Sequence, residues 1–588
     1  MAHELKDHLI IVGMGHVGYR LAEVLHALGE PFSVVTLTLR EDWRRDLAVW
    51  ALALVEGDAR SDEVLKRAGT ETARAMLIVT QDDLLNVELC VDAHRLNPSL
   101  PLIVRIFDNY LAERLRKDRG IRSVFSPSLL AAPVFTAAAL EDSVFRLVAV
   151  GKSAIPLLRL TLPTARGGVS ETLAEFCQHQ NLLPLAVYAP NLNADTPLEA
   201  HRLEVGDEIL AFACPNNPLY RARMDAQNTS HSRYSLLQLQ MRLAQRGRSL
   251  WRAVQHTSIA LRVACILYVA LLGLSVVLFH YYIPNLPHWS DALYFLVAII
   301  TTIGFGDINF RYAPTWLKLY GCGVMLGGAA FIAVLYGLLT DYLVGLRVDR
   351  ALGRHATHVT DHCIVVGLGD VGSRVVENLL EQQERVVAIE RDADHEAIPS
   401  LQDRIPVLIA DANRESSLKK ANIEEARAII VTATDDITSL RIAHLAETLN
   451  PKIRSIIRIY NSSLAKKMSE GLQITGTVNA AAEAAATFAA SAFQEGVVQG
   501  ISLGGRLYLL RWLSEAEQRE WVGKSGRALM ERFRAVAVKR DTKLFPFFPN
   551  DILKAMELVL VLEEYDSQTR TCRPPHLFAY NRSESWFG

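Results

Sequence analysis

The sequence contains two closely related stretches, DHLIIVGMGHVG at residues 7–18 and DHCIVVGLGDVG at residues 361–372. The likeness continues at an almost constant offset, so that Asp58 corresponds to Asp411. In both regions short apolar segments with strand character alternate with helical stretches, which predicts a parallel sheet with helices on both faces. The chain therefore contains one α/β domain twice.

Both copies have a G-x-G-x-x-G motif directly after the first strand. Such glycines permit a tight turn and let the backbone approach a pyrophosphate at the start of the next helix. The second copy adds Glu390 at the end of its next strand, where a carboxylate binds ribose hydroxyls, whereas the first copy has Thr38 there. We therefore predict NAD(H) or an adenine nucleotide as a ligand, with the second copy as the principal site. The predicted site residues are Gly367, Gly369, Asp370, Val371, Gly372, Glu390, Asp411 and Arg458 in the second copy, and Gly13, Gly15, Gly18, Asp58 and Arg105 in the first.

Several of these features have structural alternatives. A doubly wound domain can serve as a dimerising scaffold with an empty crevice. The two matched aspartates can cap the helices that follow them, and the two matched arginines can form salt bridges. The acidic pairs at 82–83 and 435–436 also lie at strand ends, where the alternatives are a calcium site and ordinary helix starts.

A histidine cluster precedes the second copy. His355, His358 and His362 have near-helical spacing, which is compatible with a metal site or a pH switch. However, His8 occupies the position of His362 in a copy without such a cluster. We therefore expect His362 to have a scaffold role, and no metal ligands are assigned.

An apolar region separates the two copies. No Asp, Glu, Lys or Arg occurs from Val263 to Ser290 or from Leu319 to Thr340. Both runs are long enough for a spanning helix, which needs roughly 20 apolar residues. Ala292–Gly306 is uncharged but too short to cross, which predicts a re-entrant segment whose helix starts at Ser290 and Asp291.

Arginines flank this region on both sides, at positions 242, 246, 248, 252 and 262 before it and at 347, 350 and 354 after it. The positive-inside bias predicts a multi-pass protein of the cell membrane with both termini in the cytosol. Residues 235–256 mix leucines with these arginines, so they form either an amphipathic helix on the lipid surface or a solvated linker helix.

The re-entrant segment ends in TTIGFGD, residues 301–307. Non-helical backbone at membrane depth is tolerated only where protein or water surrounds it. Alternating glycines let successive carbonyls point the same way, and several such strands on one axis can replace the hydration shell of a cation. The predicted selectivity filter comprises Thr302, Ile303, Gly304, Phe305, Gly306 and Asp307.

Two adjacent glycines, Gly327 and Gly328, lie in the middle of the second uncharged run. The low helix preference of glycine makes a bend cheaper there, which predicts a gating hinge. The alternative is close helix packing, since Gly323 and Gly327 have the spacing seen at membrane helix interfaces.

The charge balance narrows the range of partners. Sixty-two Lys and Arg face 64 Asp and Glu, for a net charge of −2, so no global basic field is available to hold nucleic acid. We therefore expect a lipid bilayer and a small-molecule nucleotide as partners, and no nucleic acid.

The segment Thr302–Gly306 resembles the selectivity filter of potassium channels, T-V-G-Y-G, with Ile303 for Val and Phe305 for Tyr. The paired α/β domains resemble RCK domains (regulators of potassium conductance) and TrkA-type uptake regulators. The resemblance covers most of the chain and implies an RCK-gated, two-transmembrane potassium channel. In that family a cytosolic ring of RCK domains pulls on the inner pore helix, and a homotetramer of this chain would supply eight of them. Here one copy precedes the pore, whereas in the commoner arrangement both follow it.

The expected fold is therefore a membrane α-helical, two-span, potassium-channel-like pore with two α/β Rossmann-like RCK domains, each with a smaller α+β C-lobe. The expected domains are the first N-lobe at 1–134, the first C-lobe at 135–222, a linker and amphipathic helix at 223–256, the pore at 257–346, a linker at 347–360, the second N-lobe at 361–490 and the second C-lobe at 491–588.

The expected function is passive potassium conduction gated by nucleotide, with a divalent cation such as calcium as a further regulator, and not enzymatic catalysis. One alternative is a membrane-anchored NAD-dependent oxidoreductase, for which the sequence shows no substrate domain and no acid–base residue at the nicotinamide. The other is a non-conducting regulatory subunit of a potassium transport system.

Overall fold

The computed structural model divides into two compact units. Residues 1–222 and 353–588 form one, here called the α/β unit, and residues 223–352 form the other, here called the helical unit. The residues that the structure describes are 5–116, 120–140, 144–150, 153–162, 171–189, 198–213, 259–283, 286–351, 357, 359–461, 474–541, 543–545, 547, 550–575 and 577–579.

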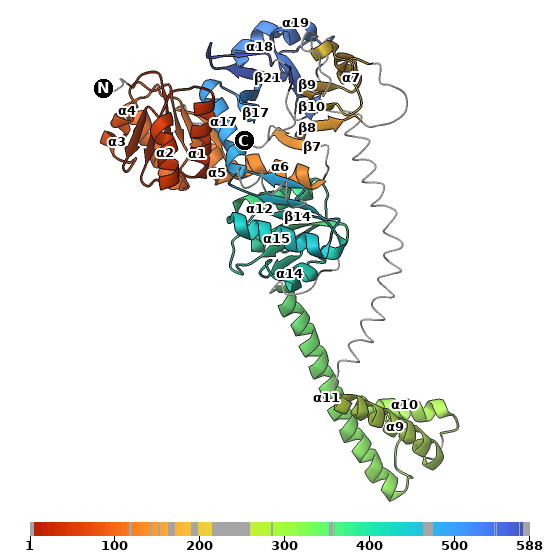
Figure 1. Cartoon of the computed structure of the whole chain (residues 1–588). Coiled ribbons are helices and arrows are strands. Elements are labelled where there is room, and N and C mark those ends of the chain that lie inside the picture. The colour runs from red at the N-terminus through yellow and green to blue at the C-terminus, as the bar shows by residue number, and fades with distance from the viewer. Residues whose placement is uncertain are drawn as a thin grey trace. The chain divides into compact units, whose positions relative to one another are not determined.

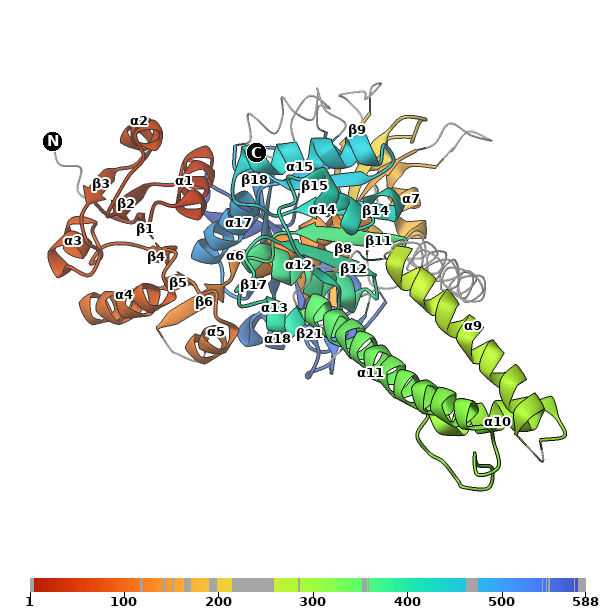
Figure 2. The ribbon, with the colours of Figure 1, turned by 90° about the horizontal axis from the view of Figure 1, so that it is seen from below.

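The α/β unit contains two six-stranded parallel sheets with equivalent strand orders, β3-β2-β1-β4-β5-β6 and β13-β12-β11-β14-β15-β16 (Figure 1; Figure 2). The strands of the first are β1 Leu9–Val12, β2 Phe32–Thr36, β3 Ala53–Glu56, β4 Ala75–Ile78, β5 Leu102–Arg105 and β6 Ile121–Phe125. Those of the second are β11 His362–Val366, β12 Val386–Glu390, β13 Val407–Ile409, β14 Ala426–Val431, β15 Arg454–Arg458 and β16 Gly476–Val478. The predicted duplicated α/β fold is confirmed.

Helices cover these sheets because the central strands are apolar on both faces and are fully buried. The helices of the first N-lobe are α1 His16–Ala27, α2 Glu41–Trp50, α3 Asp62–Arg67, α4 Asp83–Leu96 and α5 Asn109–Leu115. Those of the second are α12 Asp370–Glu381, α13 Ile398–Leu401, α14 Glu415–Lys420 and α15 Asp436–Leu449. In each sheet the strand order reverses beside the first strand, and this reversal creates the crevice in which such folds bind ligands.

The two copies exchange a helix. α6 (Pro127–Leu140) follows the first sheet but packs in the core of the second N-lobe, while α17 (Ala480–Phe493) follows the second sheet and packs against the first (Figure 1). Both helices are apolar on nearly all sides, so neither has a face suited to solvent. Arg454 donates to the carbonyl oxygen of Ala138 in α6 at 2.7 Å, and Arg122 donates to that of Ala492 in α17 at 3.0 Å.

One buried ion pair breaks the symmetry of this exchange. Arg146, on the strand after α6, and Glu483 of α17 lie 2.6 Å apart, and their side chains are 7% and 8% exposed. The offset of 353 residues between the copies puts Gln499 and Leu130 at the equivalent positions. The second crossing therefore lacks a matching ion pair.

The two C-lobes are mainly antiparallel and share one hydrophobic core. The first has the strand order β23-β9-β10-β8-β7, and the second has β17-β18-β21-β19-β20 with β22 beside β21. The first C-lobe comprises β7 Val144–Val150, β8 Ser153–Thr161, α7 Leu173–His179, β9 Leu182–Tyr188 and β10 Glu208–Ala213. The second comprises β17 Val497–Leu503, β18 Arg506–Trp512, α18 Glu515–Trp521, α19 Gly526–Arg532, β19 Arg534–Arg540, β20 Lys543–Phe545, β21 Leu558–Asp566 and β22 Thr571–Arg573, and it is followed by β23 Phe578–Ala579.

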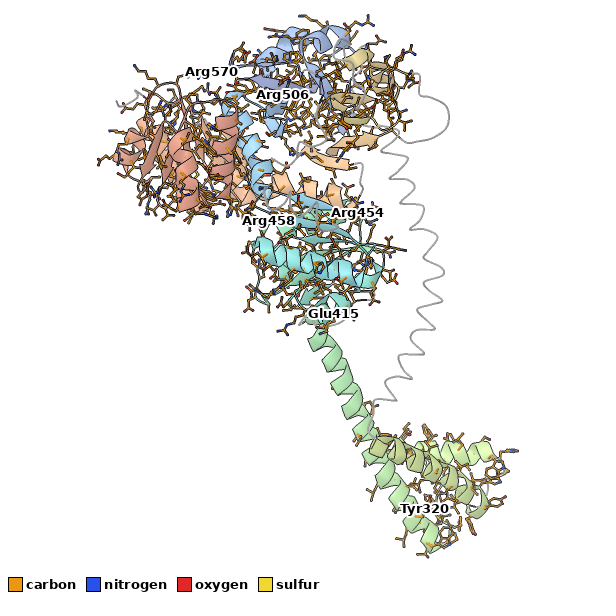
Figure 3. All side chains as sticks on the ribbon, in the orientation of Figure 1. Tyr320, Glu415, Arg454, Arg458, Arg506 and Arg570 are labelled. Carbon is orange, nitrogen blue, oxygen red and sulfur yellow. The ribbon has the colours of Figure 1, made fainter. Side chains whose placement is uncertain are left out.

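The helical unit consists of α9 (Ile259–Tyr282), α10 (Trp289–Ile300) and α11 (Thr315–Ala351). Within the described residues, one stretch is long and apolar enough to cross a membrane, Thr315–Val334 in α11. α9 is joined to α11 by a hydrogen bond of 2.8 Å between the hydroxyls of Ser275 and Tyr320, the latter labelled in Figure 3. The three helices therefore form one packed hairpin with a short helix between its arms.

The predicted start of the short helix was wrong by two residues. His288 is the N-cap, and its backbone N–H donates to the Asp291 carboxylate at 3.2 Å. Asp291 thus serves as the acid of the first turn, and Ser290 is already inside the helix. The predicted amphipathic helix at 235–256, with its arginines, lies outside the described residues, as do His355 and His358.

Candidate functional site: a filter segment and a nucleotide crevice

The segment after α10 has an alternating backbone. Thr302, Gly304 and Gly306 have φ values of +60°, +51° and +82°, whereas Ile303 and Phe305 between them do not have positive φ. The left-handed region is unfavourable for a threonine, so its use here indicates a backbone held by its surroundings. This alternation is what the predicted ladder of carbonyl oxygens requires.

α10 holds this segment in two ways. The backbone N–H groups of Ile303 and Gly304 donate to the carbonyl oxygen of Ala298, at 3.1 and 3.3 Å. The Tyr294 hydroxyl lies near the Asp307 carboxylate, and the Tyr294 ring lies parallel to that of Phe305, with centroids 6.3 Å apart. Phe305 lacks a hydroxyl, and Tyr294 supplies one from the helix instead. Sequence reasoning missed Tyr294, because the contact depends on the chain folding back on α10.

The filter segment is open on its other side. Ile303 and Phe305 are 59% and 68% exposed, and a Cβ added at Gly304 or Gly306 would have no atom within 4 Å. A single chain therefore leaves two large apolar side chains and two glycines of this segment uncovered.

The two glycines of α11 have different surroundings. A Cβ on Gly328 would lie 3.1 Å from Ile300 at the end of the short helix, whereas a Cβ on Gly327 would meet nothing. Gly328 thus allows close packing of α10 on α11. A hinge role for Gly327 stays a prediction.

A cavity of about 570 Å³ lies at the carboxyl ends of the second sheet. It contains most of the predicted nucleotide residues of the second copy, and the first copy supplies part of its wall. The predicted site residues that line it are Gly367, Gly369, Asp370, Val371, Glu390, Asp411, Arg458 and, from the first copy, Arg105. His16 and Gln81 of the first copy also line it and were not predicted.

The glycine loop of the second copy forms the start of this cavity. Gly367 has φ +87°, and a Cβ on Gly372 would lie 1.9 Å from the carbonyl oxygen of Gly367, so no larger residue fits there. Gly369 is the N-cap of α12, no side chain caps this end, and the space above it is open. The free N–H groups of α12 therefore offer an anion site at the position expected for a pyrophosphate.

Glu390 lies at the edge of the cavity and is 9% exposed. One carboxylate oxygen accepts from the backbone N–H of Leu368 at 2.6 Å, and the other accepts from those of Arg391 and Asp392 at 2.7 and 3.0 Å. A carboxylate accepts about four hydrogen bonds, so Glu390 retains room for a ribose hydroxyl while it fixes the glycine loop.

The sequence-based choice of Thr38 as the counterpart of Glu390 was wrong. Strand pairing sets Val12 opposite Val35 in the first copy and Val366 opposite Ile389 in the second, which makes Thr36 the equivalent position. The Thr36 hydroxyl donates to the carbonyl oxygen of Thr38 at 2.7 Å. The first copy thus has no carboxylate at this place.

The two matched aspartates also differ. Asp411 accepts from the backbone and side-chain nitrogens of Asn413 at 3.0 and 2.9 Å, and these bonds lower its pKa. Asp58 is instead engaged by the guanidinium of Arg60, with a closest distance of 2.7 Å, and this lowers its pKa. In the first copy Asp58 is therefore held in a salt bridge, and it is not among the residues that line the cavity.

The two matched arginines extend towards the opposite copy. Arg105 is near Asp370 at the start of α12, and burial lowers the pKa of Arg105 while Asp370 and Asp83 oppose this shift. Arg458, labelled in Figure 3, lies over the Tyr460 ring at 4.6 Å and is near His16 at the start of α1.

Aromatic rings crowd the start of α1. The His16 ring lies 4.0 Å from that of Tyr460 and 5.6 Å from that of Trp43, measured between centroids. Burial lowers the pKa of His16, and nearby Arg40 and Arg458 lower it further. As in the second copy, the last glycine is obligatory, since a Cβ on Gly18 would lie 2.0 Å from the carbonyl oxygen of Gly13.

The acidic pairs hold backbone groups. Asp82 and Asp435 are the N-caps of α4 and α15. Asp83 accepts from Phe107 N–H and Asp436 from Tyr460 N–H, at 2.8 and 3.0 Å. Within the described part of the chain, no three His, Cys, Asp or Glu side chains converge as metal ligands.

His8 and His362 are equivalent and fully buried. Their Nε2 atoms lie 2.8 and 2.9 Å from the carbonyl oxygens of Ala68 and Ala421, and their Nδ1 atoms have no partner. Burial lowers the pKa of both. This position supports the scaffold role expected for His362.

Comparison with known proteins gives two family matches. A TrkA-N domain model matches residues 9–127 and 363–480, and an ion channel model matches residues 258–345. The matches therefore coincide with the two parallel sheets and the helical unit.

Similar proteins include two from Methanocaldococcus jannaschii. Probable potassium channel protein 2 is 29% identical over 198 residues, which are 32% of this chain and 56% of that protein. Potassium channel protein 1 is 30% identical over 124 residues, 21% of this chain and 36% of that protein. The chain thus covers 56% of the length of the first relative and 36% of the length of the second.

Among solved structures, the GsuK channel bound to NAD is 15% identical, with a TM-score of 0.48, over 97% of this chain and 79% of that one. Together, the two family matches and their order along the chain give its domain organisation. Two regions that match the TrkA-N domain model flank one region that matches the ion channel model.

Proposed function

We propose that this protein is a ligand-gated potassium channel that conducts passively through a homotetrameric pore. The observation that carries the proposal is the alternation of positive φ at Thr302, Gly304 and Gly306, within the region matched by the ion channel model. Successive carbonyl oxygens of such a segment can line one side of an ion path. One chain supplies one such strand, so several chains are needed to surround the ion.

The exposed side of the segment supports assembly around an axis. Ile303 and Phe305 are too apolar to remain uncovered, and neighbouring copies would bury them. Four copies complete the filter and bring eight TrkA-N domains into one ring. In this proposal α9 and α11 both cross the cell membrane, α10 is re-entrant, and both termini are cytosolic.

The gating ligand is NAD(H) or an adenine nucleotide in the crevice of the second copy. The open N-terminus of α12 suits its phosphates, and Glu390 suits its ribose. Four sites that each contribute about 1.4 kcal/mol of differential affinity would supply the roughly 5.5 kcal/mol that inverts a 1:99 equilibrium. The segment predicted as a linker at 347–360 would carry the effect of the ligand to α11, which itself extends to Ala351.

The test is ion flux into liposomes that contain the purified full chain, with potassium compared against sodium. NAD⁺, NADH, ADP, ATP and calcium are added in turn. We expect potassium flux that exceeds sodium flux and that changes with at least one nucleotide. Flux without potassium preference, or flux that no nucleotide alters, would contradict the proposal.

Two variants separate this function from its rivals. Gly304→Val should abolish flux, because Val would need positive φ in the filter. Gly273→Ala in α9 is the control, since a Cβ there meets nothing, and it should conduct normally. Function that survives Gly304→Val would favour a non-conducting subunit, and sustained NADH consumption with a defined substrate would favour an oxidoreductase.

A further inference from the structure

Arg105 stands out in the nucleotide crevice because it is a cation of the first copy in a cavity over the second. Its side chain makes no hydrogen bond or ion pair with any residue that the structure describes, and its Nε is buried without a partner. The charged groups that affect it are Asp370 and Asp83, which favour its charged form, and Arg458, which opposes it. A half-buried guanidinium without a paired carboxylate is stabilised when a further anion joins it.

The matched residue of the second copy, Arg458, also has a buried Nε without a hydrogen-bond partner, but its guanidinium lies on an aromatic ring. Arg458 lies over the Tyr460 ring at 4.6 Å, and its charge opposes the rise in the Tyr460 pKa that burial causes. The equivalent of Tyr460 in the first copy is Phe107, which has no hydroxyl to offer Arg105. Both matched arginines therefore present a cation to the cavity, and Arg105 is the one that the first copy supplies.

The position opposite Arg105 suits a phosphate. α12 begins at Asp370, whose carboxylate has the largest electrostatic effect on Arg105. No side chain caps the N-terminal N–H groups of α12, and the space beside Gly369 is open. A guanidinium and a helix N-terminus that face one space make a stronger anion site than either alone.

Side chains lie closer to the glycine loop of the first copy than to that of the second. Gly15 has Gln81 Nε2 at 3.6 Å from the position of a Cβ, and the His16 ring makes a tilted contact with Tyr460 and an edge contact with Trp43. Thr36 offers no carboxylate for a ribose. A nucleotide would have to displace two aromatic contacts to reach the start of α1.

We propose that each chain binds one nucleoside diphosphate group, held between the N-terminus of α12 and Arg105 of the other copy, while the first copy binds none. The inference rests on the proposed nucleotide site and adds its stoichiometry and its phosphate-binding residue. The ligand then joins the two N-lobes, so its binding depends on their relative position in the α/β unit.

The test is calorimetric titration of the full chain in detergent with ADP and, by competition, with adenosine. We expect one ADP per chain. Arg105→Gln should weaken ADP binding about 10-fold or more and leave adenosine binding unchanged, because only ADP carries the anion. Arg105→Lys should restore part of the loss, and Arg95→Gln, an exposed arginine paired with Asp62, should bind as the wild type does.

Thermal unfolding shows whether the Arg105→Gln variant is still folded. Without ligand, Arg105→Gln should not lower the midpoint, since it removes a half-buried charge that has no paired carboxylate, but it should reduce the upward shift caused by ADP. Two ADP per chain, equal losses for ADP and adenosine, an unchanged ADP affinity or no binding by the wild type would overturn the inference. Absence of ion flux with this binding pattern intact would refute the channel and leave the inference standing.

Discussion

The two copies of the α/β domain share a backbone but differ at the places where a nucleotide would bind. Both have an obligatory last glycine, in contact with the first carbonyl of the loop, at Gly18 and Gly372. Only the second has a carboxylate at the end of its second strand, and only the second has open space before its first helix. The glycine motif therefore defines the turn, whereas its neighbours define a binding site.

The difference shows how a duplicated domain can divide its work. The His16–Tyr460–Trp43 cluster lies at the start of α1, and His16, Gln81 and Arg105 of the first copy form part of the wall of the second site. Arg60, which takes the place of Asn413, ties up Asp58 on the same copy. The first copy thus keeps the fold and contributes side chains to its partner.

The largest effect is expected at the helix exchange. Glu483→Leu should lower the stability of the α/β unit by about 3–5 kcal/mol, because Arg146 is left charged and buried. Adding Arg146→Gln reproduces the Leu130 and Gln499 of the other crossing and should recover most of the loss. Thermal unfolding of the full chain measures both, and a double variant as unstable as the single one would break the equivalence of the crossings.

The glycine loops provide the next test. Gly18→Ala and Gly372→Ala should each destabilise their N-lobe by about 2–4 kcal/mol, because the added Cβ overlaps a carbonyl oxygen 2.0 or 1.9 Å away. ADP binding should be lost in Gly372→Ala and largely kept in Gly18→Ala. Titration on protein that remains folded measures this, and loss of binding in Gly18→Ala alone would reverse the assignment of the two copies.

A smaller effect is expected when Glu390 is replaced. Glu390→Gln replaces one accepting oxygen by a donor, which disturbs the loop contact at Leu368 or Arg391 and removes charge from the ribose site. We expect about 10-fold weaker ADP binding. Thr36→Val at the equivalent position should leave ADP affinity unchanged, and a similar loss in both variants would indicate a general structural effect.

The smallest effect concerns pH and should be equal in the two copies. Burial depresses the pKa of His8 and His362 below the ordinary 6.5, so the unfolded chain binds more protons as the pH falls below that value. Stability should therefore be constant above about pH 7 and fall towards pH 5.5, by at most about 1.4 kcal/mol per pH unit and histidine.

Single variants test that equality. His8→Gln and His362→Gln should each remove a similar part of the pH dependence of the unfolding temperature. A pH dependence that only one of the buried histidines carries would show that the two strand entries are not equivalent.

The repeated motifs allowed most of this fold to be predicted. The two parallel sheets follow from local signals, namely apolar strands and the loop from Gly367 to Gly372 that turns into α12. The short helix before the filter follows from an uncharged run too short to span. These features depend on residues close together in sequence.

The features that sequence reasoning missed depend on distant contacts. The exchange of α6 and α17 brings together residues over 300 positions apart, and a uniformly apolar helix does not indicate which core it joins. Thr36, not Thr38, is equivalent to Glu390 because strand register decides the match. Tyr294 meets Asp307 only once the chain turns back on α10.

Current across a planar bilayer that contains the full chain, recorded under opposed potassium and sodium gradients before and after ADP is added, tests the central claim most directly. We predict a reversal potential close to that of potassium and a change in open probability when ADP is present. A current that reverses near zero, one that ADP leaves unaltered, or no current at all would contradict a potassium pore governed by the second copy.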